Sequence, residues 1–161
     1  VPYWRQMWQR SSISSAPLVP LMDNSTYEEQ LDLHGQLVYT NVGDSMMPLL
    51  RENRDLMVIT RKGEGRMKKY DAILYRRPDG KYIMHRILKV RKDDYILCGD
   101  NRWQREVGVK DDWILGVLTA VIRDGKEISV KDWRYRLYVH LWCDFFYIRG
   151  GILWLKGKLH R

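Results

Sequence analysis

Hydrophobic and polar residues follow a strand-like pattern in the middle of the chain and a helix-like spacing of three to four residues near its C-terminal end. Between residues 37 and 130, short runs rich in β-branched and aromatic residues are separated by turn residues, a pattern typical of β-strands. The predicted strands cover residues 37–42, 56–60, 72–76, 82–91, 94–98, 114–122 and 127–130. Tight turns at Pro78-Asp79-Gly80, Lys92-Asp93 and Asp124-Gly125 indicate antiparallel hairpins between neighbouring runs.

Helical signals lie on both sides of this β-rich region. Ser25-Thr26 precedes the acids Glu28 and Glu29, and Gly35 follows, which predicts a short helix between a capping hydroxyl and a glycine stop. Beyond residue 132, apolar residues recur every three or four positions, which predicts an amphipathic helix that weakens at Gly150-Gly151. These apolar positions are Leu137, Leu141, Phe145, Ile148, Ile152, Leu155 and Leu159.

The elements together predict a mainly β fold, with curled antiparallel sheets or a partly open β-barrel, a short N-terminal helix and a C-terminal amphipathic helical tail. We divide the chain into an N-terminal arm (residues 1–24), a β domain (25–132) and a basic, aromatic-rich tail (133–161). Two interpretations of the tail stay open: a helix packed on the β domain, or an interfacial helix with its aromatic residues at headgroup depth.

Charge singles out the tail as well. Residues 133–161 hold six Lys/Arg against the single acid Asp144, a net charge of +5 out of +8 for the whole chain, which leaves +3 for residues 1–132. A nearly neutral body argues against a nucleic-acid-binding surface across the domain, and we expect no nucleic-acid partner. By charge alone the tail suits membrane lipid as well as RNA, and we retain a membrane surface as the expected partner of residues 133–161.

Several classes of protein are excluded by composition. Cys98 and Cys143 are the only cysteines, too few for a disulfide framework, and no Cys/His pair has zinc-ligand spacing, so we expect two buried thiols, no metal and no cofactor. No run of about 18 uncharged apolar residues exists, and the N-terminus lacks the apolar core of a signal peptide. We therefore expect a protein that is cytoplasmic or peripheral to a membrane, without a transmembrane segment.

The chemistry of the chain centres on Gly43-Asp44-Ser45-Met46-Met47-Pro48. A serine placed between a glycine and a proline is a candidate nucleophile, but its hydroxyl is inert near neutral pH without an adjacent base. His85-Arg86, Gly99-Asp100-Asn101 and Glu106 follow in order. Imidazole titrates close enough to neutrality to accept and return a proton, so these are the parts of a serine hydrolase.

The same segments resemble the signal peptidase I and repressor-autolysis superfamily of serine peptidases, over roughly residues 28 to 123. The matching segments are Gly43-x-Ser45-Met46-x-Pro48, Arg54-Asp55-Leu56-Met57-Val58, Tyr70-Asp71-Ala72-Ile73-Leu74-Tyr75, His85-Arg86 and Gly99-Asp100-Asn101. The resemblance implies a β fold of the signal-peptidase type and a serine endopeptidase that cleaves a leader, signal or precursor peptide. Where bacterial signal peptidases and repressors carry a lysine base, this chain has His85, as the endoplasmic-reticulum type does.

The resemblance also implies roles. Ser45 attacks the peptide carbonyl, and His85 takes the proton of Ser45 and hands it to the leaving amine. An acid six residues after Asp100 would orient the histidine. That acid is Glu106, where the histidine-bearing relatives have aspartate. Asp100 is the other candidate for this role, and its alternative interpretation is a structural residue that holds the loop after Cys98.

The oxyanion site departs from the signal peptidases too. They commonly carry a serine donor two residues before the nucleophile, but this chain has Gly43, so backbone N–H groups such as that of Ser45 would have to stabilise the developing charge. We expect the cleft to involve Gly43 and Asp44, with Met46 as an apolar wall and Pro48 fixing the turn.

These departures keep a second hypothesis open: a catalytically inactive module on the same fold that binds peptide or membrane. A DNA-binding repressor is the weakest alternative, because no helix-turn-helix precedes the catalytic segments and His85 occupies the lysine position.

Overall fold

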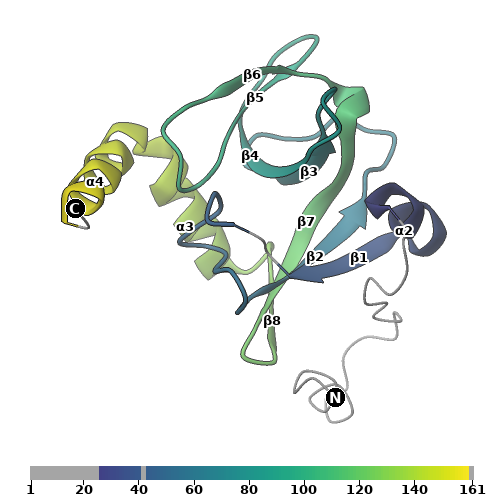
Figure 1. The fold of residues 1–161 in the computed structure, drawn as a ribbon, viewed down its shortest axis with the longest axis horizontal. Helices are drawn as coiled ribbons and strands as arrows, with labels where there is room; N and C mark the ends of the chain where they lie inside the picture. Colours follow the sequence, from purple (N-terminus) through teal and green to yellow (C-terminus); the bar gives the residue numbers. More distant parts are fainter. Residues whose placement is uncertain (1–25, 41–42, 160–161) are drawn as a thin grey trace.

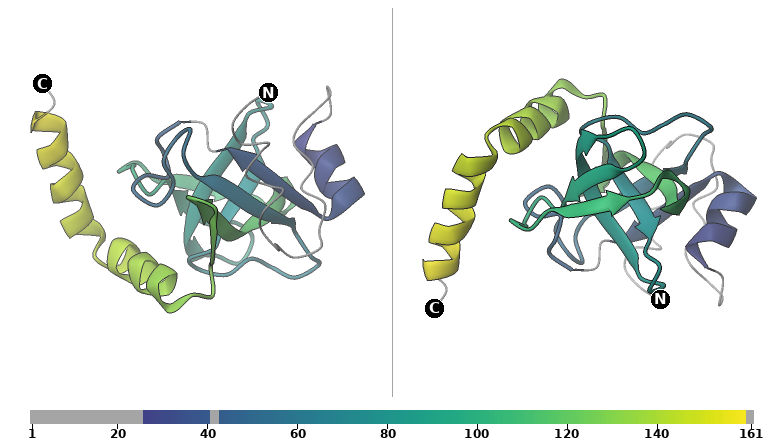
Figure 2. Two further views of the ribbon diagram at one scale, coloured as in Figure 1. Left: turned by 90° about the horizontal axis from the view of Figure 1, so that it is seen from below. Right: turned by 90° about the horizontal axis from the view of Figure 1, so that it is seen from above.

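The computed structural model describes residues 26–40 and 43–159 of the chain. One antiparallel sheet of eight strands forms the body, with helix α2 at one side and helices α3 and α4 at the other (Figures 1 and 2). The sheet is open and does not close into a barrel, because its strand order runs from β1 at one edge to β6 at the other. The predicted arm of residues 1–24 lies outside the described residues.

Most strands form where the two-residue period predicts them. Their order in the sheet is β1-β2-β7-β3-β4-β5-β6, with β8 paired to β7 as a hairpin. The strands are β1 (Gln36–Thr40), β2 (Leu56–Arg61), β3 (Ala72–Arg76), β4 (Tyr82–Val90), β5 (Tyr95–Cys98), β6 (Glu106–Val109), β7 (Ile114–Arg123) and β8 (Lys126–Ser129). The 3-10 turn η2 (Asp111–Trp113) precedes β7. The sequence pattern did not predict β6, whose four residues contain only two apolar side chains, both valines.

Helix α2 (Tyr27–His34) confirms the predicted short helix. The Thr26 hydroxyl accepts a hydrogen bond from the Glu29 N–H, and the Glu29 carboxylate accepts one from the Thr26 N–H at 2.8 Å. This reciprocal capping satisfies two donors at the start of the helix. Gly35 ends the helix with φ +68°, a left-handed conformation that glycine adopts without a side-chain clash.

The sheet curls so that strands distant in the sheet order approach each other. A flat sheet would separate β3 from β6 by about 14 Å, three interstrand spacings. Nevertheless the hydroxyl of Tyr75 on β3 donates to the carboxylate of Glu106 on β6 at 2.6 Å. Inside this curl lies an apolar cluster that includes Ile73, Ile87 and Leu97.

A larger core fills the space between β2, β3, β7, the loop after β1 and helix α3 (Trp133–Asp144). Tyr135, Val139 and Cys143 of α3 are each 8% exposed or less and pack into this core. Both cysteines are buried and free, as expected.

The C-terminal region forms two helices rather than one. Helix α3 ends at Asp144, and α4 (Phe146–Leu159) begins after Phe145, which has a non-helical backbone. The predicted weak point at Gly150-Gly151 is instead continuous helix. A Cβ at Gly150 would lie 1.8 Å from the Trp103 ring, so this glycine serves close packing rather than a break.

A fully buried ion pair joins the sheet, the loop after β5 and α3. The guanidinium of Arg86 on β4 donates to both carboxylate oxygens of Asp100, at 2.9 and 2.7 Å, and neither side chain is exposed. Arg86 Nη1 also donates to the Tyr70 carbonyl and the Tyr135 hydroxyl. Tyr138 donates to the Asp100 carboxylate at 3.0 Å, and Trp142 donates to the Asp100 carbonyl at 2.7 Å.

Removing one charge of this pair should destabilise the fold strongly, because a buried cation without its partner costs about 3 kcal/mol or more. We expect Asp100→Asn to lower the free energy of unfolding, measured by urea denaturation, by about that amount. The matched control is Asp32→Asn, which breaks the exposed Asp32–Arg61 pair and should change stability little. Equal effects of the two substitutions would contradict the role of the buried pair.

Candidate active site

Ser45 lies in a tight turn after β1. The Met47 N–H donates to the Asp44 carbonyl and the Leu50 N–H to the Met46 carbonyl, both at 3.0 Å. Gly43 enters the turn with φ +88°, where a residue with a side chain would be strained. Met46 is fully buried and is part of the main core, whereas Ser45 stays partly accessible. The turn is therefore anchored by its apolar side chain while its serine faces the surface.

A second buried acid, Asp55, helps to connect this turn to the sheet. Asp55 is fully buried and accepts hydrogen bonds from Arg54 and from Arg123 of β7. Arg123 also donates to the Leu49 carbonyl at 2.6 Å. Burial opposes ionisation of Asp55, but the two arginines outweigh it and hold the pKa of that carboxyl well below its usual range. The turn is thus tied to the sheet through a charged cluster as well as through Met46.

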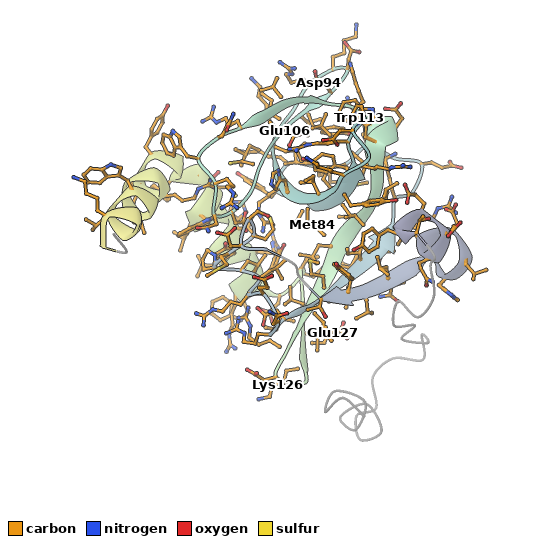
Figure 3. The ribbon with its side chains drawn as sticks, viewed as in Figure 1. Met84, Asp94, Glu106, Trp113, Lys126 and Glu127 are labelled. Atoms are coloured by element: carbon orange, nitrogen blue, oxygen red, sulfur yellow. The ribbon has the colours of Figure 1, made fainter. Side chains whose placement is uncertain are left out.

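His85 lies in the middle of β4 with its side chain 13% exposed. Its Nδ1 is 3.3 Å from the Tyr75 hydroxyl and 3.6 Å from Glu106 Oε2. Glu106 also accepts hydrogen bonds from both Tyr75 and Arg77, the latter from Nε at 2.7 Å. Tyr75 and Glu106 together hold one side of the imidazole. Figure 3 shows Glu106 at the opposite end of the molecule from Lys126, which begins β8.

The other side of the imidazole faces the serine turn. A Cβ at Gly99 would lie 2.7 Å from the Ser45 carbonyl oxygen and 3.2 Å from His85 Cδ2. Cδ2 is bonded to Nε2, on the opposite side of the ring from Nδ1. The bare backbone of Gly99 therefore lets the Ser45 turn and the Nε2 side of His85 approach one spot. The Asn101 N–H donates to the same Ser45 carbonyl at 2.8 Å, which fixes the turn against this loop.

The structure separates the two candidate acids. Glu106 approaches His85, whereas both carboxylate oxygens of Asp100 are bound to Arg86 on the other face of β4. Successive side chains of a strand point to opposite faces, so His85 and Arg86 serve different clusters. Asp100 thus has a structural role, although through a buried ion pair rather than a capped turn.

Tyr75 and Arg77 are contacts that the sequence interpretation missed. Tyr75 is paired across from Ile83 in the β3–β4 ladder, which puts it on the same face as His85 two residues further on. The register of the β3–β4 hairpin is therefore the feature that could have pointed to Tyr75. Arg77 lies just after β3 and gave no comparable signal.

Burial dominates the electrostatics of His85. Desolvation lowers the pKa of His85 to about 4; the negative charge of Glu106 raises this pKa, and the positive charge of Arg77 lowers it. Burial would raise the pKa of Glu106, but hydrogen bonds from Arg77 and Tyr75 outweigh burial and lower it. At neutral pH the arrangement therefore places a neutral imidazole beside an ionised carboxylate, as proton transfer from a hydroxyl requires.

The remaining predicted cleft residues have separate roles. The Gly43 N–H donates to the Glu52 carboxylate at 3.1 Å, and Pro48 lies exposed after a cis peptide bond with Met47. Asp44 is exposed and pairs with Arg102 and Asn101. Within residues 26–40 and 43–159, the Ser45 N–H has no hydrogen-bond acceptor.

A groove of about 620 Å³ adjoins this site. It is lined by Asn101, Arg102, Trp103, Gly150, Gly151 and Trp154. Asn101 and Arg102 also bond to the Ser45 turn, so one wall of this groove adjoins the turn. No group of His, Cys, Asp or Glu side chains in the described part of the chain could hold a metal ion.

Comparison with known proteins finds no significant match: no family model, no curated protein and no solved structure. The site is therefore judged on its own residues and geometry.

Titration of His85 tests this electrostatic arrangement. NMR of the ring should give a pKa near 4, with Arg77→Gln raising it and Glu106→Gln lowering it, because the two groups act with opposite charge. Since the folded pKa lies below the unfolded value of about 6.5, the contribution of His85 to stability is full above that pH and is lost as the pH falls toward 4. A His85 pKa near 6.5, or no opposite response of the two variants, would contradict the arrangement.

Proposed function

We propose that this protein is a serine endopeptidase of the signal-peptidase type, which hydrolyses a peptide bond in a leader, signal or precursor peptide. The observation that carries the proposal is the position of His85. Tyr75 and Glu106 hold its Nδ1 side, and its Nε2 side is turned toward the Ser45 turn across Gly99.

In this mechanism His85 accepts the Ser45 proton as the hydroxyl attacks the scissile carbonyl, and then gives it to the leaving amine. Glu106 stabilises the imidazolium that forms between these steps. Arg77 shares the charge of Glu106, which weakens this stabilisation. The extra methylene of glutamate relative to aspartate lets one carboxylate contact Tyr75 and Arg77 while it approaches His85.

Backbone groups supply the oxyanion site in this proposal. The tetrahedral intermediate carries negative charge on the former carbonyl oxygen, which needs preorganised donors. The Ser45 N–H is the candidate donor, since the Gly43 N–H donates to Glu52.

Sheet topology supports binding of the substrate as an extended strand. β1 leads toward the Ser45 turn and, among the described strands, pairs only with β2. A peptide added along such an edge gains main-chain hydrogen bonds, and pockets for alternate side chains select its sequence.

A second function, peptide binding without cleavage, is favoured by one observation. Within the described residues no hydrogen bond joins the Ser45 hydroxyl to His85. Catalytic hydrogen bonds are often long before substrate binds, so the peptidase proposal retains priority.

Substitution of the two central residues distinguishes these functions. The full chain is incubated with a large peptide library, and new termini are identified by mass spectrometry. Ser45→Ala and His85→Gln should each lower cleavage by about 10³-fold or more, because neither half of the pair activates a nucleophile alone. Unchanged circular dichroism would verify the folds. Wild-type turnover by both variants, or no cleavage by the wild type, would refute the peptidase proposal.

Gly99→Ala tests the geometry that carries the proposal. The added methyl would contact both the Ser45 carbonyl and the His85 ring, so it should push the turn away from the base and lower kcat by about tenfold or more, as small displacements of reacting groups do. Gly65→Ala is the matched control, because nothing lies within 4 Å of its added Cβ. Similar activities of the two variants would argue against the convergence at Gly99.

A further inference from the structure

Six of the periodic apolar residues of the C-terminal helices are at least half exposed. We call Leu137, Leu141, Phe145, Ile148, Ile152 and Leu155 the outer stripe. Their exposed fractions lie between 50% and 61%. Leu137 and Leu141 lie in α3, Phe145 lies at the break, and Ile148, Ile152 and Leu155 lie in α4, so exposed apolar residues run along both helices.

The inner side of the same helices is already occupied. Tyr135, Val139 and Cys143 fix α3 to the core, and Arg149 fixes α4. Arg149 is 2% exposed, and its Nη2 donates to the Gly99 carbonyl at 3.4 Å and to the Arg102 carbonyl. Rotating the helices to bury the outer stripe would break these contacts. Figure 2 shows the helices along one flank of the molecule, so that their outer side faces away from the strands.

Exposed aromatic and basic residues lie on the same two helices, where Tyr147 contacts Trp103 and Trp154 lines the groove. Trp133, Tyr147 and Trp154 are 67%, 79% and 63% exposed. Lys158 lies over the Trp154 ring, and Arg134 lies over the Trp133 ring. Large aromatic side chains and Lys/Arg beside an apolar face characterise helices that lie in a membrane interface.

Charge decides between a lipid surface and a second copy of the chain. Residues 133–161 carry a net +5 with a single acid, and Arg134, Arg136 and Lys158 are exposed on these helices, so two copies that met through the helices would repel each other. An anionic lipid surface attracts the same charges. Among the described helices none is long and apolar enough to cross a bilayer.

We propose that α3 and α4 dock on anionic lipid bilayers through the outer stripe, lying in the plane of the interface. The stripe then enters the boundary between headgroups and acyl chains, and the exposed residues Arg134, Arg136 and Lys158 contact lipid phosphates. Because Arg149 contacts the loop of Gly99 and Arg102, docking places the groove beside Ser45 close to the bilayer. The docking itself does not depend on catalysis.

Vesicle co-sedimentation of the full chain tests the proposal. Phosphatidylcholine vesicles with and without phosphatidylserine are compared, using wild type and the variant Ile148→Ser/Ile152→Ser/Leu155→Ser. Wild type should bind the anionic vesicles. The variant should bind about tenfold or more weakly, because it lacks three aliphatic side chains that would enter the bilayer. All three side chains are exposed, so the fold should persist. The matched control, Leu33→Ser/Val107→Ser, removes exposed apolar residues elsewhere and should bind as wild type does.

A second variant tests the charge. Arg134→Gln/Arg136→Gln/Lys158→Gln should weaken binding to the phosphatidylserine vesicles, and added salt should do the same to wild type. Equal binding by wild type and the stripe variant overturns the proposal. A second result would also overturn it: wild type forms a dimer in analytical ultracentrifugation, the stripe variant does not, and neither protein binds vesicles. The experiment measures vesicle binding rather than cleavage, so the Ser45→Ala variant should bind the anionic vesicles as wild type does.

Discussion

The buried Arg86–Asp100 pair is the interaction on which the rest of the structure depends. Arg86 follows His85 in β4, and Asp100 follows Gly99, so both residues that shape the site are covalent neighbours of the pair. Arg86 also reaches Tyr135, and Asp100 accepts a bond from Tyr138, which fixes α3. A charge that is wholly removed from water must keep its partner. The pair therefore holds the sheet, the loop after β5 and the helix in one relative arrangement.

Curvature of the sheet assembles the polar groups around His85. Tyr75 and Glu106 come from strands that are separated by β4 and β5 in the sheet order, and only the curl brings their side chains to the same ring. Burial in this curl lowers the pKa of His85 and keeps the imidazole neutral. Glu106, ionised through its bonds to Arg77 and Tyr75, opposes part of that shift. The base in the proposed mechanism is thus tuned by burial first and by its acid second.

The C-terminal helices use their two sides differently. One side supplies Tyr135 and Val139 to the core and Arg149 to the loop after β5, and these contacts set how the helices are rotated. The outer stripe then faces solvent, because the sheet accepts only one side of a helix. Both sides of α3 are therefore regularly spaced: Tyr135, Val139 and Cys143 are buried, whereas Leu137 and Leu141 are exposed.

Local physics allowed much of the chain to be predicted from sequence. Thr26 and Gly35 define α2 through backbone capping, and the turn Asp124-Gly125 defines the β7–β8 hairpin through positive φ angles. Ser45, His85 and Glu106 were likewise expected from residue type and order. Tertiary structure decided what depends on distant partners: β6 exists because β5 pairs with it, Tyr75 joins the site through the curl, and Asp100 binds Arg86 because alternate side chains of β4 face opposite ways. It also decided which side of α3 is buried, since helical spacing shows that an apolar stripe exists but not what covers it.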